Sequence, residues 1–506
     1  MSKPVISDLA LAAAFTLLVT PWVARMGDII SNEPLYLLAA WKWWRPDFLA
    51  SDWTYAVPWR EHTLFNAGAG LLSLALPLDT FKWVLRIAGW FAVFASLFAL
   101  LRRMSIPWWF GALGIICWLQ VEQTFLGGEW IIGGAEAKVP AYAALFFAVS
   151  AFLDRRYPAG GLLLGLCFSF HPAVGVGAGV GVAAALLVDG VSWRGMATAA
   201  GAALATALPG VISSVGLSRD SGAAGAWELL VTARLPHHLD PLAFGRSGHL
   251  KVAIFLCLLA LLVARWRPSR EVRLLAGFVA GTGLVYAFGI AARLAEAWPL
   301  MQIYPFRLLP LLLPLFIPAL LATQLIRQWP NRRIRRELAL ALAGCLVVLF
   351  FDPDRLAGGP VDEARAAAEA AEGRERAAAA AWVAAHAPMD AVVLVSPSDK
   401  RSFWDYRRGL VVSWLMPRYE RYSEWLARME ALAGPIEPRV RGQSARFDSR
   451  FHAIPADSIQ VLAAKYGAGL LVSRGSYPFP VRHRAGNLTI YSIPAAASLS
   501  SPPRAP

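Results

Sequence analysis

The stretch FKWVLRIAGWFAVFASLFALL at residues 81–101, followed at once by Arg102 and Arg103, decides the class of this protein. An α-helix needs about 20 apolar residues to cross the roughly 30 Å of hydrocarbon in a bilayer, and this stretch has that length and character. Paired arginines directly after such a run indicate the cytoplasmic end of a span, because short cytoplasmic loops are enriched in Lys and Arg. We therefore expect a membrane-spanning helix that ends on the cytoplasmic side.

The composition of the whole chain supports the same class. Of its 506 residues, 57% are hydrophobic and 16% are charged, whereas soluble domains have about 45–50% and about 25%. The net charge is +14, but the basic residues lie mostly between apolar runs, so the charge indicates membrane topology and no nucleic-acid partner is expected. The four cysteines lie inside apolar stretches without paired spacing, which suggests neither a disulfide framework nor a zinc site.

Eleven stretches have the character of membrane spans. They are 5–25, 81–101, 107–125, 139–153, 159–171, 174–188, 195–215, 250–264, 274–292, 304–326 and 338–352. Arginines fall in alternate loops between these stretches, which puts the N-terminus on the cytoplasmic side. The alternation holds only if residues 62–76 form a short interfacial helix and not a further span.

This topology divides the chain into a membrane domain at 1–352 and an extracytoplasmic soluble domain at 353–496. The outer loops of the membrane domain are 26–80, 126–138, 216–249 and 293–303. The soluble domain is expected to be a small α/β domain with helices at 362–386, 419–432 and 458–466 and strands at 391–396, 410–414, 469–473 and 488–493. No glycine-rich phosphate loop follows these strands, and no Ser/His/Asp or Cys/His spacing matches a known motif. The low-complexity tail at 497–506 is expected to be disordered.

The first outer loop is rich in carboxylates, and Asp28, Glu33 and Asp52 are candidate catalytic residues. Glu33 begins the amphipathic stretch EPLYLLAAWKWW, and Asp52 directly precedes Trp53 and Tyr55, whose rings suit stacking on a sugar. One of these acids could act as a general base on a sugar hydroxyl or as a ligand of a divalent cation. For any single acid, the competing interpretation is a hydrated loop charge without a chemical role.

Charged residues at the outer ends of later spans are candidate substrate-binding or phosphate-binding groups. They are Glu136 and Lys138 beside the span at 139–153, His171, then Arg234, His237 and His238 in RLPHHLDP, and Arg307 at the start of 304–326. A guanidinium at the edge of the hydrocarbon is costly without an anion, and phosphate binding is its most natural use. The alternatives are a carboxylate partner for Arg307, snorkelling of Lys138 or its pairing with Glu136, and a helix-terminus hydrogen bond for His171.

The order of these features resembles the GT-C superfamily of polytopic glycosyltransferases, which use polyprenyl-phosphate-linked sugars. The resemblance rests on an inside N-terminus, one span, a long acidic outer loop ending in HTLFNAGAGLLSLALP at 62–77, and the span that closes on Arg102 and Arg103. It covers roughly the first 350 residues as architecture. In that superfamily an acid of a first-loop pair acts as base or metal ligand. The comparable place here reads Asn32-Glu33, so one acid is missing and Asp28 or Asp52 is the candidate substitute.

The resemblance implies an enzyme of the bacterial inner membrane that transfers a sugar from a polyprenyl-phosphate-linked donor to an acceptor on the extracytoplasmic face. Its implied partners are the lipid-linked donor and membrane lipids, and a divalent cation is the one cofactor that the acids suggest. One alternative is a transporter or flippase of a lipid-linked or anionic substrate, although no inverted repeat is evident. Another is a non-catalytic GT-C-like scaffold, which the missing acid at Asn32 favours.

Overall fold

The computed structural model describes residues 3–25, 29–30, 32–56, 62–121, 123–215, 225–266, 268–350, 363–398, 401–414, 421–440 and 442–494. The chain divides into two compact units. The membrane unit comprises Met1–Ile30, Arg60–Val215 and Leu230–Gly358, and the sheet unit comprises Ser31–Trp59, Gly216–Leu229 and Gly359–Pro506. Residues 31–59 and 216–229, which are parts of the segments expected as the first and third outer loops, therefore belong to the same unit as the C-terminal region. The boundary expected at residue 352 did not indicate this.

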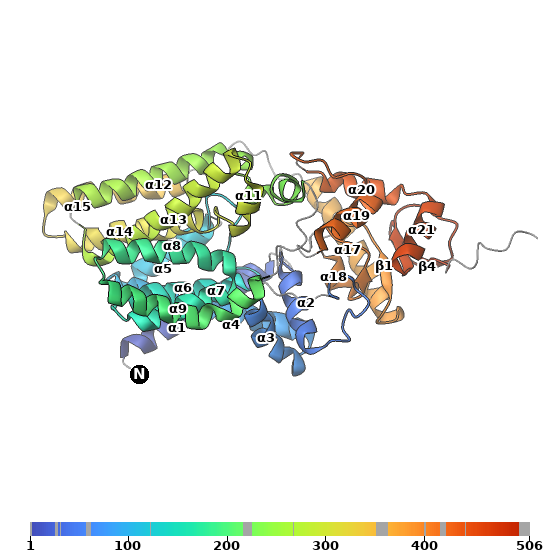
Figure 1. The fold of residues 1–506 in the computed structure, drawn as a ribbon, viewed down its shortest axis with the longest axis horizontal. Coiled ribbons are helices and arrows are strands. Elements are labelled where there is room, and N and C mark those ends of the chain that lie inside the picture. Colours follow the sequence, from blue (N-terminus) through green and yellow to red (C-terminus); the bar gives the residue numbers. More distant parts are fainter. Residues whose placement is uncertain are drawn as a thin grey trace, which may run out of the picture. The chain divides into compact units, whose positions relative to one another are not determined.

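The membrane unit is built of helices (Figure 1). Its longer helices are α1 (Lys3–Arg25), α4 (Leu78–Arg103), α5 (Trp108–Gln120), α6 (Lys138–Leu153), α7 (Tyr157–Phe170), α8 (Pro172–Val188), α9 (Trp193–Ser214), α12 (Arg246–Arg265), α13 (Arg270–Leu294), α14 (Leu308–Arg327) and α15 (Arg332–Phe350). Short helical turns connect them: α3 (Thr63–Gly70), η1 (Leu71–Leu74), η2 (Leu230–Arg234), α11 (Pro236–Leu239), η3 (Pro241–Ala243) and η4 (Trp298–Ile303). A helix thus lies at each of the eleven stretches expected to span, and residues 63–74 form only a short helical segment.

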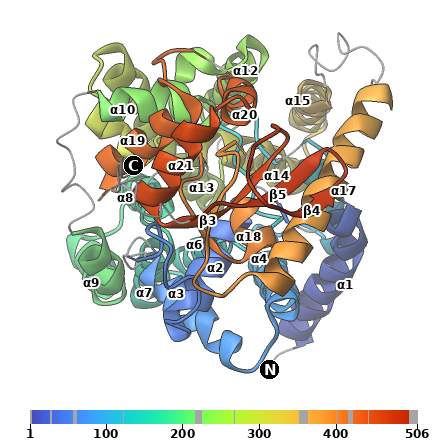
Figure 2. The ribbon, with the colours of Figure 1, turned by 90° about the vertical axis from the view of Figure 1, so that its right-hand side faces the viewer.

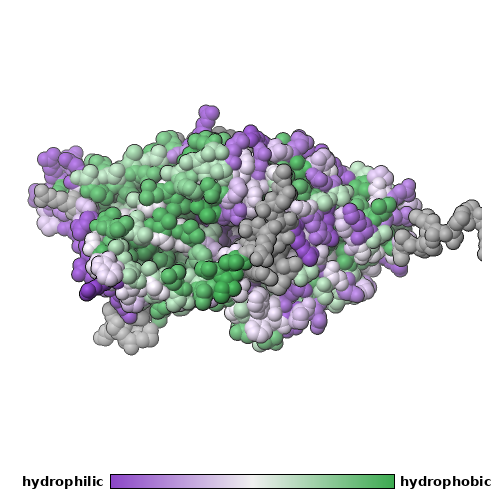
Figure 3. Space-filling view, in the orientation of Figure 1, coloured by the Kyte–Doolittle hydropathy of each residue, from purple (hydrophilic) through white to green (hydrophobic). Residues whose placement is uncertain are grey.

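Six helices among the described residues are long and apolar enough to cross a membrane. They are α1, α4, α9, α12, α13 and α14, whereas α5, α6, α7 and α8 are apolar but shorter. Figure 3 shows hydrophobic residues over the flank of this unit, with hydrophilic residues at the end that carries the α14–α15 connection. Exposed apolar side chains such as Leu204 and Leu208 on α9 account for this surface, which suits lipid contact and not water.

Arginines at the ends of the helices are held by acidic partners. Arg102 lies 2.8 Å from Asp8, and Arg103 lies 2.7 Å from Asp154. These pairs join α4 to α1 and to the end of α6. Arg270 at the start of α13 pairs in the same way with Asp189 at 2.6 Å, at the end of α8. The basic residues that the sequence assigns to the cytoplasmic side therefore also tie neighbouring helices together.

Small residues allow helices α7 and α9 to approach each other closely. A Cβ atom added at Gly165 would lie 2.1 Å from the carbonyl oxygen of Ala203, and one at Gly161 would lie 2.2 Å from that of Ala199. The four-residue spacing places both glycines on one face of α7, as in the small-residue interfaces of membrane helices. Backbone contact of this kind replaces the hydrophobic driving force that lipid does not supply.

The sheet unit contains a five-stranded sheet with the order β2-β1-β3-β5-β4. The strands are β1 (Val392–Leu394), β2 (Gly409–Leu410), β3 (Ala468–Ser473), β4 (Val481–Ala485) and β5 (Leu488–Ser492). β2, β1 and β3 are parallel, and β5 runs antiparallel to β3 and β4. The helices are α2 (Glu33–Trp44), α10 (Ala226–Leu229), α17 (Glu363–His386), α18 (Ser402–Tyr406), α19 (Tyr422–Ala433), α20 (Ser444–His452) and α21 (Ala456–Tyr466). In Figure 2, α17 lies beside β4 and β5, and α21 beside β3.

The elements of this region differ from the expected ones in four places. The strand expected at 410–414 is only the two-residue β2, and β4, α18 and α20 were not expected. β4 is an edge strand whose sequence VRHRA has no apolar alternation, because most of its side chains face solvent. The helix expected at 362–386 and the strands expected near 391–396, 469–473 and 488–493 are present. The tail at 497–506 lies outside the described residues.

We predict that Gly165→Ala destabilises the protein by about 1–3 kcal/mol, the usual cost of overpacking a tight interface. The added methyl group would overlap the backbone of α9. Gly201→Ala on α9 is the matched control, since a Cβ there meets no atom within 4 Å. Thermal unfolding of the purified protein in detergent measures both variants, and equal unfolding temperatures would disprove the close α7–α9 contact.

Candidate functional site

A group of buried charged residues lies where several helices of the membrane unit begin or end. Arg307 is the N-cap residue of α14, Lys138 is the first residue of α6, and Glu129 lies in the loop before α6. The Nε atom of Arg307 lies 3.2 Å from the Glu129 carboxylate, and the Lys138 ammonium lies 3.8 Å from the same carboxylate. Both contacts are between groups that are almost entirely removed from solvent. We call this group, with the neighbours described next, the charged cluster.

Lys138 has two further partners in the cluster. Its ammonium lies 3.1 Å from the carboxylate of Glu136 and 3.9 Å from the centre of the Trp130 ring. A cation over an indole face gains electrostatic stabilisation that is larger when water is excluded. Lys138 is therefore fixed and does not snorkel, and the pairing with Glu136 considered from the sequence is present.

The loop from Gln123 to Ala137 has a defined shape that positions these acids. The side-chain oxygen of Gln123 accepts hydrogen bonds from the backbone N–H groups of Ile131 and Ile132, both at 2.8 Å. The indole N–H of Trp90 on α4 donates to the carbonyl of Gly133 at 3.0 Å. Gly127 and Gly128 both have positive φ, of 75° and 57°, which glycine adopts without strain. The loop therefore holds Glu129 and Glu136 on a rigid frame.

Two histidines lie next to Arg307. An Nη atom of Arg307 donates to Nε2 of His171 at 2.8 Å, and the rings of His171 and His62 are 4.9 Å apart. His171 lies in the turn between α7 and α8, directly before Pro172. Because Nε2 accepts, a neutral His171 carries its proton on Nδ1. That buried Nδ1 has no hydrogen-bond partner among the described residues, which leaves a donor available to a ligand oxygen.

The segment expected as the third outer loop contributes His238 to the same place. Its Nδ1 donates to the carbonyl of Gly127, and a Cβ at Gly128 would lie 3.6 Å from the rings of both His237 and His238. Burial and the positive charges of His237 and Arg307 lower the pKa of His238 well below its usual value. Arg234 lies nearby in sequence, buried at the end of η2. The structure thus brings together Lys138, Glu136, His171, His238 and Arg307, five of the residues selected from the sequence.

The two candidate bases that the structure describes lie in the sheet unit. Glu33 is fully buried in the first turn of α2, where the helix dipole favours a negative charge. Asp28 lies outside the described residues. No group of three or more His, Cys, Asp or Glu side chains within the described ranges could hold a metal ion.

The carboxylate of Asp52 is held by hydrogen bonds within the sheet unit. Its carboxylate accepts backbone hydrogen bonds from Thr54 at 2.8 Å, Tyr55 at 3.0 Å and Leu410 of β2 at 2.8 Å. The residue is fully buried, and three N–H donors occupy the lone pairs that a general base would use. Asp52 is therefore better explained as the group that fastens the first-loop segment to the sheet, and its predicted catalytic role finds no support in this geometry.

Helix α4 carries two buried cations that were not selected from the sequence. Lys82 and Arg86 lie one turn apart on α4, and their side chains are almost inaccessible to solvent. The Arg86 guanidinium lies 4.8 Å from the centre of the Trp83 ring. The sequence could have indicated both residues, because ionisable residues inside an apolar run are uncommon and generally face the interior of a helix bundle. Glu129 was not selected either, although it contacts both cations of the cluster.

Comparison with known protein families, curated proteins and solved structures found no match to this chain. The chemistry of the charged cluster therefore has to be inferred from its own residues.

We predict that Asp52 makes the stability of the sheet unit depend on pH. Burial raises its pKa from 3.8 to about 6, although its backbone hydrogen bonds act in the opposite direction. The folded protein then binds this proton more readily than the unfolded chain does. The contribution of Asp52 to the free energy of unfolding is therefore fully present below pH 3.8 and is lost as the pH rises through about 6. Between pH 7 and pH 5, the wild type should gain about 1.4 kcal/mol relative to Asp52→Asn.

Thermal unfolding of both proteins at the two pH values measures this difference. The Asn variant is the reference because it cancels the titration of all other groups. A wild type that loses stability relative to the variant on acidification would contradict the prediction.

Proposed function

We propose that the protein is a membrane glycosyltransferase that transfers a sugar from a polyprenyl-phosphate-linked donor. The charged cluster is the observation that carries the proposal. Arg307, Lys138, Glu129 and Glu136 are buried together at the ends of apolar helices, where each unpaired charge would be costly. Such groups in membrane proteins usually mark substrate sites, and a phosphate is the ligand that guanidinium and ammonium groups bind best at such a place.

The carboxylates of the cluster explain how the cations persist without a ligand. The carboxylates of Glu129 and Glu136 balance the charges of Arg307 and Lys138, so these four residues together carry no net charge. A phosphate group would add acceptors for Arg307, whose side chain is the most exposed of the four at 11%, and for the N–H of His171. Arg234 is a further cation of the third loop that could assist.

The reaction proposed is a direct displacement at the anomeric carbon. The acceptor hydroxyl oxygen forms the new glycosidic bond while the bond from the anomeric carbon to the phosphate oxygen breaks, and polyprenyl phosphate leaves. A base takes the hydroxyl proton, and the configuration at the anomeric carbon inverts. The sequence offers Glu33 as this base, and its side chain is fully buried in the sheet unit.

The way the sheet unit is assembled supports a specific membrane topology. Asp52 bonds to Leu410, and Arg439 pairs with Glu228 at 2.9 Å, so segments from the first loop, the third loop and the C-terminal region belong to one unit. A compact unit lies on one side of a bilayer, so the chain must cross it an even number of times between these segments. Between residues 229 and 359, α12, α13 and α14 are candidate spans. We therefore propose that α15 crosses as well, with the sheet unit on the extracytoplasmic side of the inner membrane.

One observation favours transport as a second candidate function. Ionisable groups buried among apolar helices also line the substrate paths of transporters, and His171, in the turn between α7 and α8, adjoins the charged cluster. In this alternative, the cluster would bind the phosphate of a lipid-linked substrate during its movement across the membrane without breaking a bond.

The proposed enzyme should remove the sugar from a member of a panel of polyprenyl-phosphate sugars when the purified protein is reconstituted in lipid. We expect Arg307→Gln and Lys138→Gln to reduce turnover on the order of 100-fold or more, as loss of an electrostatic stabiliser does. Arg194→Gln is the control, because Arg194 is exposed at the start of α9. Mass spectrometry of the lipid product gives the rate, and Glu33→Gln tests the base. Saturable donor binding without bond cleavage by the wild type would favour transport instead.

The topology predicts that cysteines introduced at Asp47 and Ser476 react with a membrane-impermeant thiol reagent from the same side of intact cells. Both positions are exposed in the sheet unit. A cysteine at Arg155, in a loop assigned to the cytoplasm, should react only after the membrane is permeabilised. Labelling of positions 47 and 476 from opposite sides would exclude an α15 that crosses the membrane.

A further inference from the structure

The sheet unit has a topological switch point at the carboxyl ends of two parallel strands. β1 lies between β2 and β3, and all three run in the same direction. The chain leaves β1 through α18 to reach β2 on one side, and then passes through α19, α20 and α21 to reach β3 on the other side. In open sheets with parallel strands, ligands bind at the place where the strand order reverses in this way.

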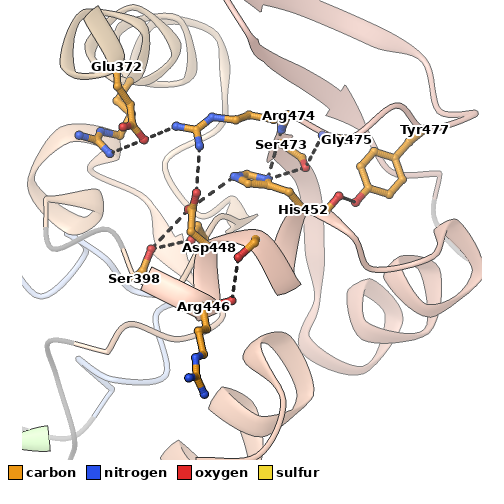
Figure 4. A network of polar contacts seen from close by, with 12 residues as sticks. Glu372, Ser398, Arg446, Asp448, His452, Ser473, Arg474, Gly475 and Tyr477 are labelled. Carbon is orange, nitrogen blue, oxygen red and sulfur yellow. Dashed lines mark hydrogen bonds and ion pairs between the residues drawn. The ribbon is translucent and has the colours of Figure 1, made fainter. Parts of the chain in front are cut away.

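Polar side chains from three elements meet at this place (Figure 4). Ser396 and Ser398 follow β1, Ser473 ends β3, and Asp448 belongs to α20. The hydroxyls of Ser396 and Ser398 are 2.9 Å apart, and Ser398 donates to the Asp448 carboxylate at 3.4 Å. Arg474, directly after β3, donates to the other oxygen of Asp448 at 2.9 Å. Residues far apart in the sequence are thus combined in one hydrogen-bonded surface site.

Helix α17 adds a second carboxylate, from Glu372, and a second guanidinium group, from Arg376. The Arg474 guanidinium also contacts the carboxylate of Glu372, which pairs with Arg376 at 3.1 Å. The side chains of Asp448, Arg474 and Glu372 are 30%, 33% and 35% exposed. These groups therefore remain accessible to a ligand while their positions are fixed by one another.

The site contains a Ser–His–Asp arrangement that does not have the access of a catalytic triad. Nδ1 of His452 accepts from the hydroxyl of Ser473 at 2.8 Å, and Nε2 lies 3.5 Å from Asp448. However, Ser473 is fully buried, and its oxygen already accepts from the N–H of Gly475 at 3.0 Å. The oxygen of a nucleophilic serine must reach its substrate. Ser473 therefore holds His452 and Asp448 in position and does not act as a nucleophile.

We propose that this switch-point site binds a saccharide. Asp448, Glu372, Arg474 and Arg376 carry two negative and two positive charges in mutual contact. Sugar hydroxyls both donate and accept, so they satisfy carboxylates and guanidinium groups together without a change in net charge. Tyr477, whose ring stacks on that of Phe479, lies next to the switch-point site, with its hydroxyl 3.4 Å from the carbonyl of His452.

The inference deepens the proposed function, because it makes the acceptor a saccharide that the sheet unit binds. The two proposals involve different residues, so they can fail separately. Arg307→Gln should abolish sugar transfer from the lipid donor while saccharide binding to the sheet unit remains. Binding without transfer in the wild type would overturn the proposed function and leave this inference in place.

The test is a titration of the full-length protein in lipid nanodiscs with methyl glycosides of glucose, galactose, N-acetylglucosamine and glucuronic acid, followed by saturation-transfer-difference NMR. We expect at least one glycoside to bind the wild type and to bind Asp448→Asn and Arg474→Gln about tenfold or more weakly, since each loses a hydrogen bond to a charged group. Arg482→Gln on the exposed edge strand β4 is the matched control and should bind as the wild type does. Unfolding temperatures show whether each variant is folded, and Glu372→Gln replaces any that is not.

Three results would overturn the inference. The first is the absence of binding by all four glycosides. The second is equal affinity of the wild type and the folded variants. The third is binding of inorganic phosphate that displaces the glycosides, which would make the place an anion site.

Discussion

The hydrogen bond from the backbone N–H of Leu410 to the carboxylate of Asp52 joins residues that are 358 positions apart. It fixes the first-loop segment to the edge strand β2, and Arg428 strengthens the junction by lying 4.4 Å from the centre of the Trp53 ring. The sheet unit therefore includes residues from before the second membrane helix. The membrane topology of the whole chain therefore depends on how many times the chain crosses the bilayer between Asp52 and Leu410.

A second constraint is the cost of burying charge. The cluster around Arg307 and Lys138 keeps four charges away from water, and pairing them in this way seldom stabilises a fold more than apolar side chains would. Ligand binding, as proposed above, would give these buried charges a role. The loop that carries Glu129 and Glu136 supports this interpretation, because hydrogen bonds from Ile131 and Ile132 to Gln123 fix its shape.

Apolar run length and arginine placement predicted the helices of the membrane unit well, because the bilayer leaves the backbone few alternatives. The sequence also selected Lys138, His171, His238 and Arg307, whose charges stand out beside apolar runs. It did not show that Asp52 bonds to a strand far along the chain, because such pairing depends on tertiary structure. Likewise, β4 escaped prediction because Arg482, His483 and Arg484 hide the alternation of an ordinary strand. The switch-point residues Asp448 and Ser473 carry no local signal, since only the strand order brings them together.

The discontinuous sheet unit also has a consequence for biosynthesis. At about 5–20 residues per second, the ribosome needs roughly 20–70 s to proceed from Asp52 to Leu410. During that interval the membrane helices are already being inserted, while the first-loop segment lacks the strand that its carboxylate will bind. Asp52 is then an ordinary hydrated acid, and it becomes buried only after almost the whole chain has been translated. A nascent chain that stalls before β2 would leave Trp53 and Tyr55, which are buried in the complete sheet unit, exposed to proteases.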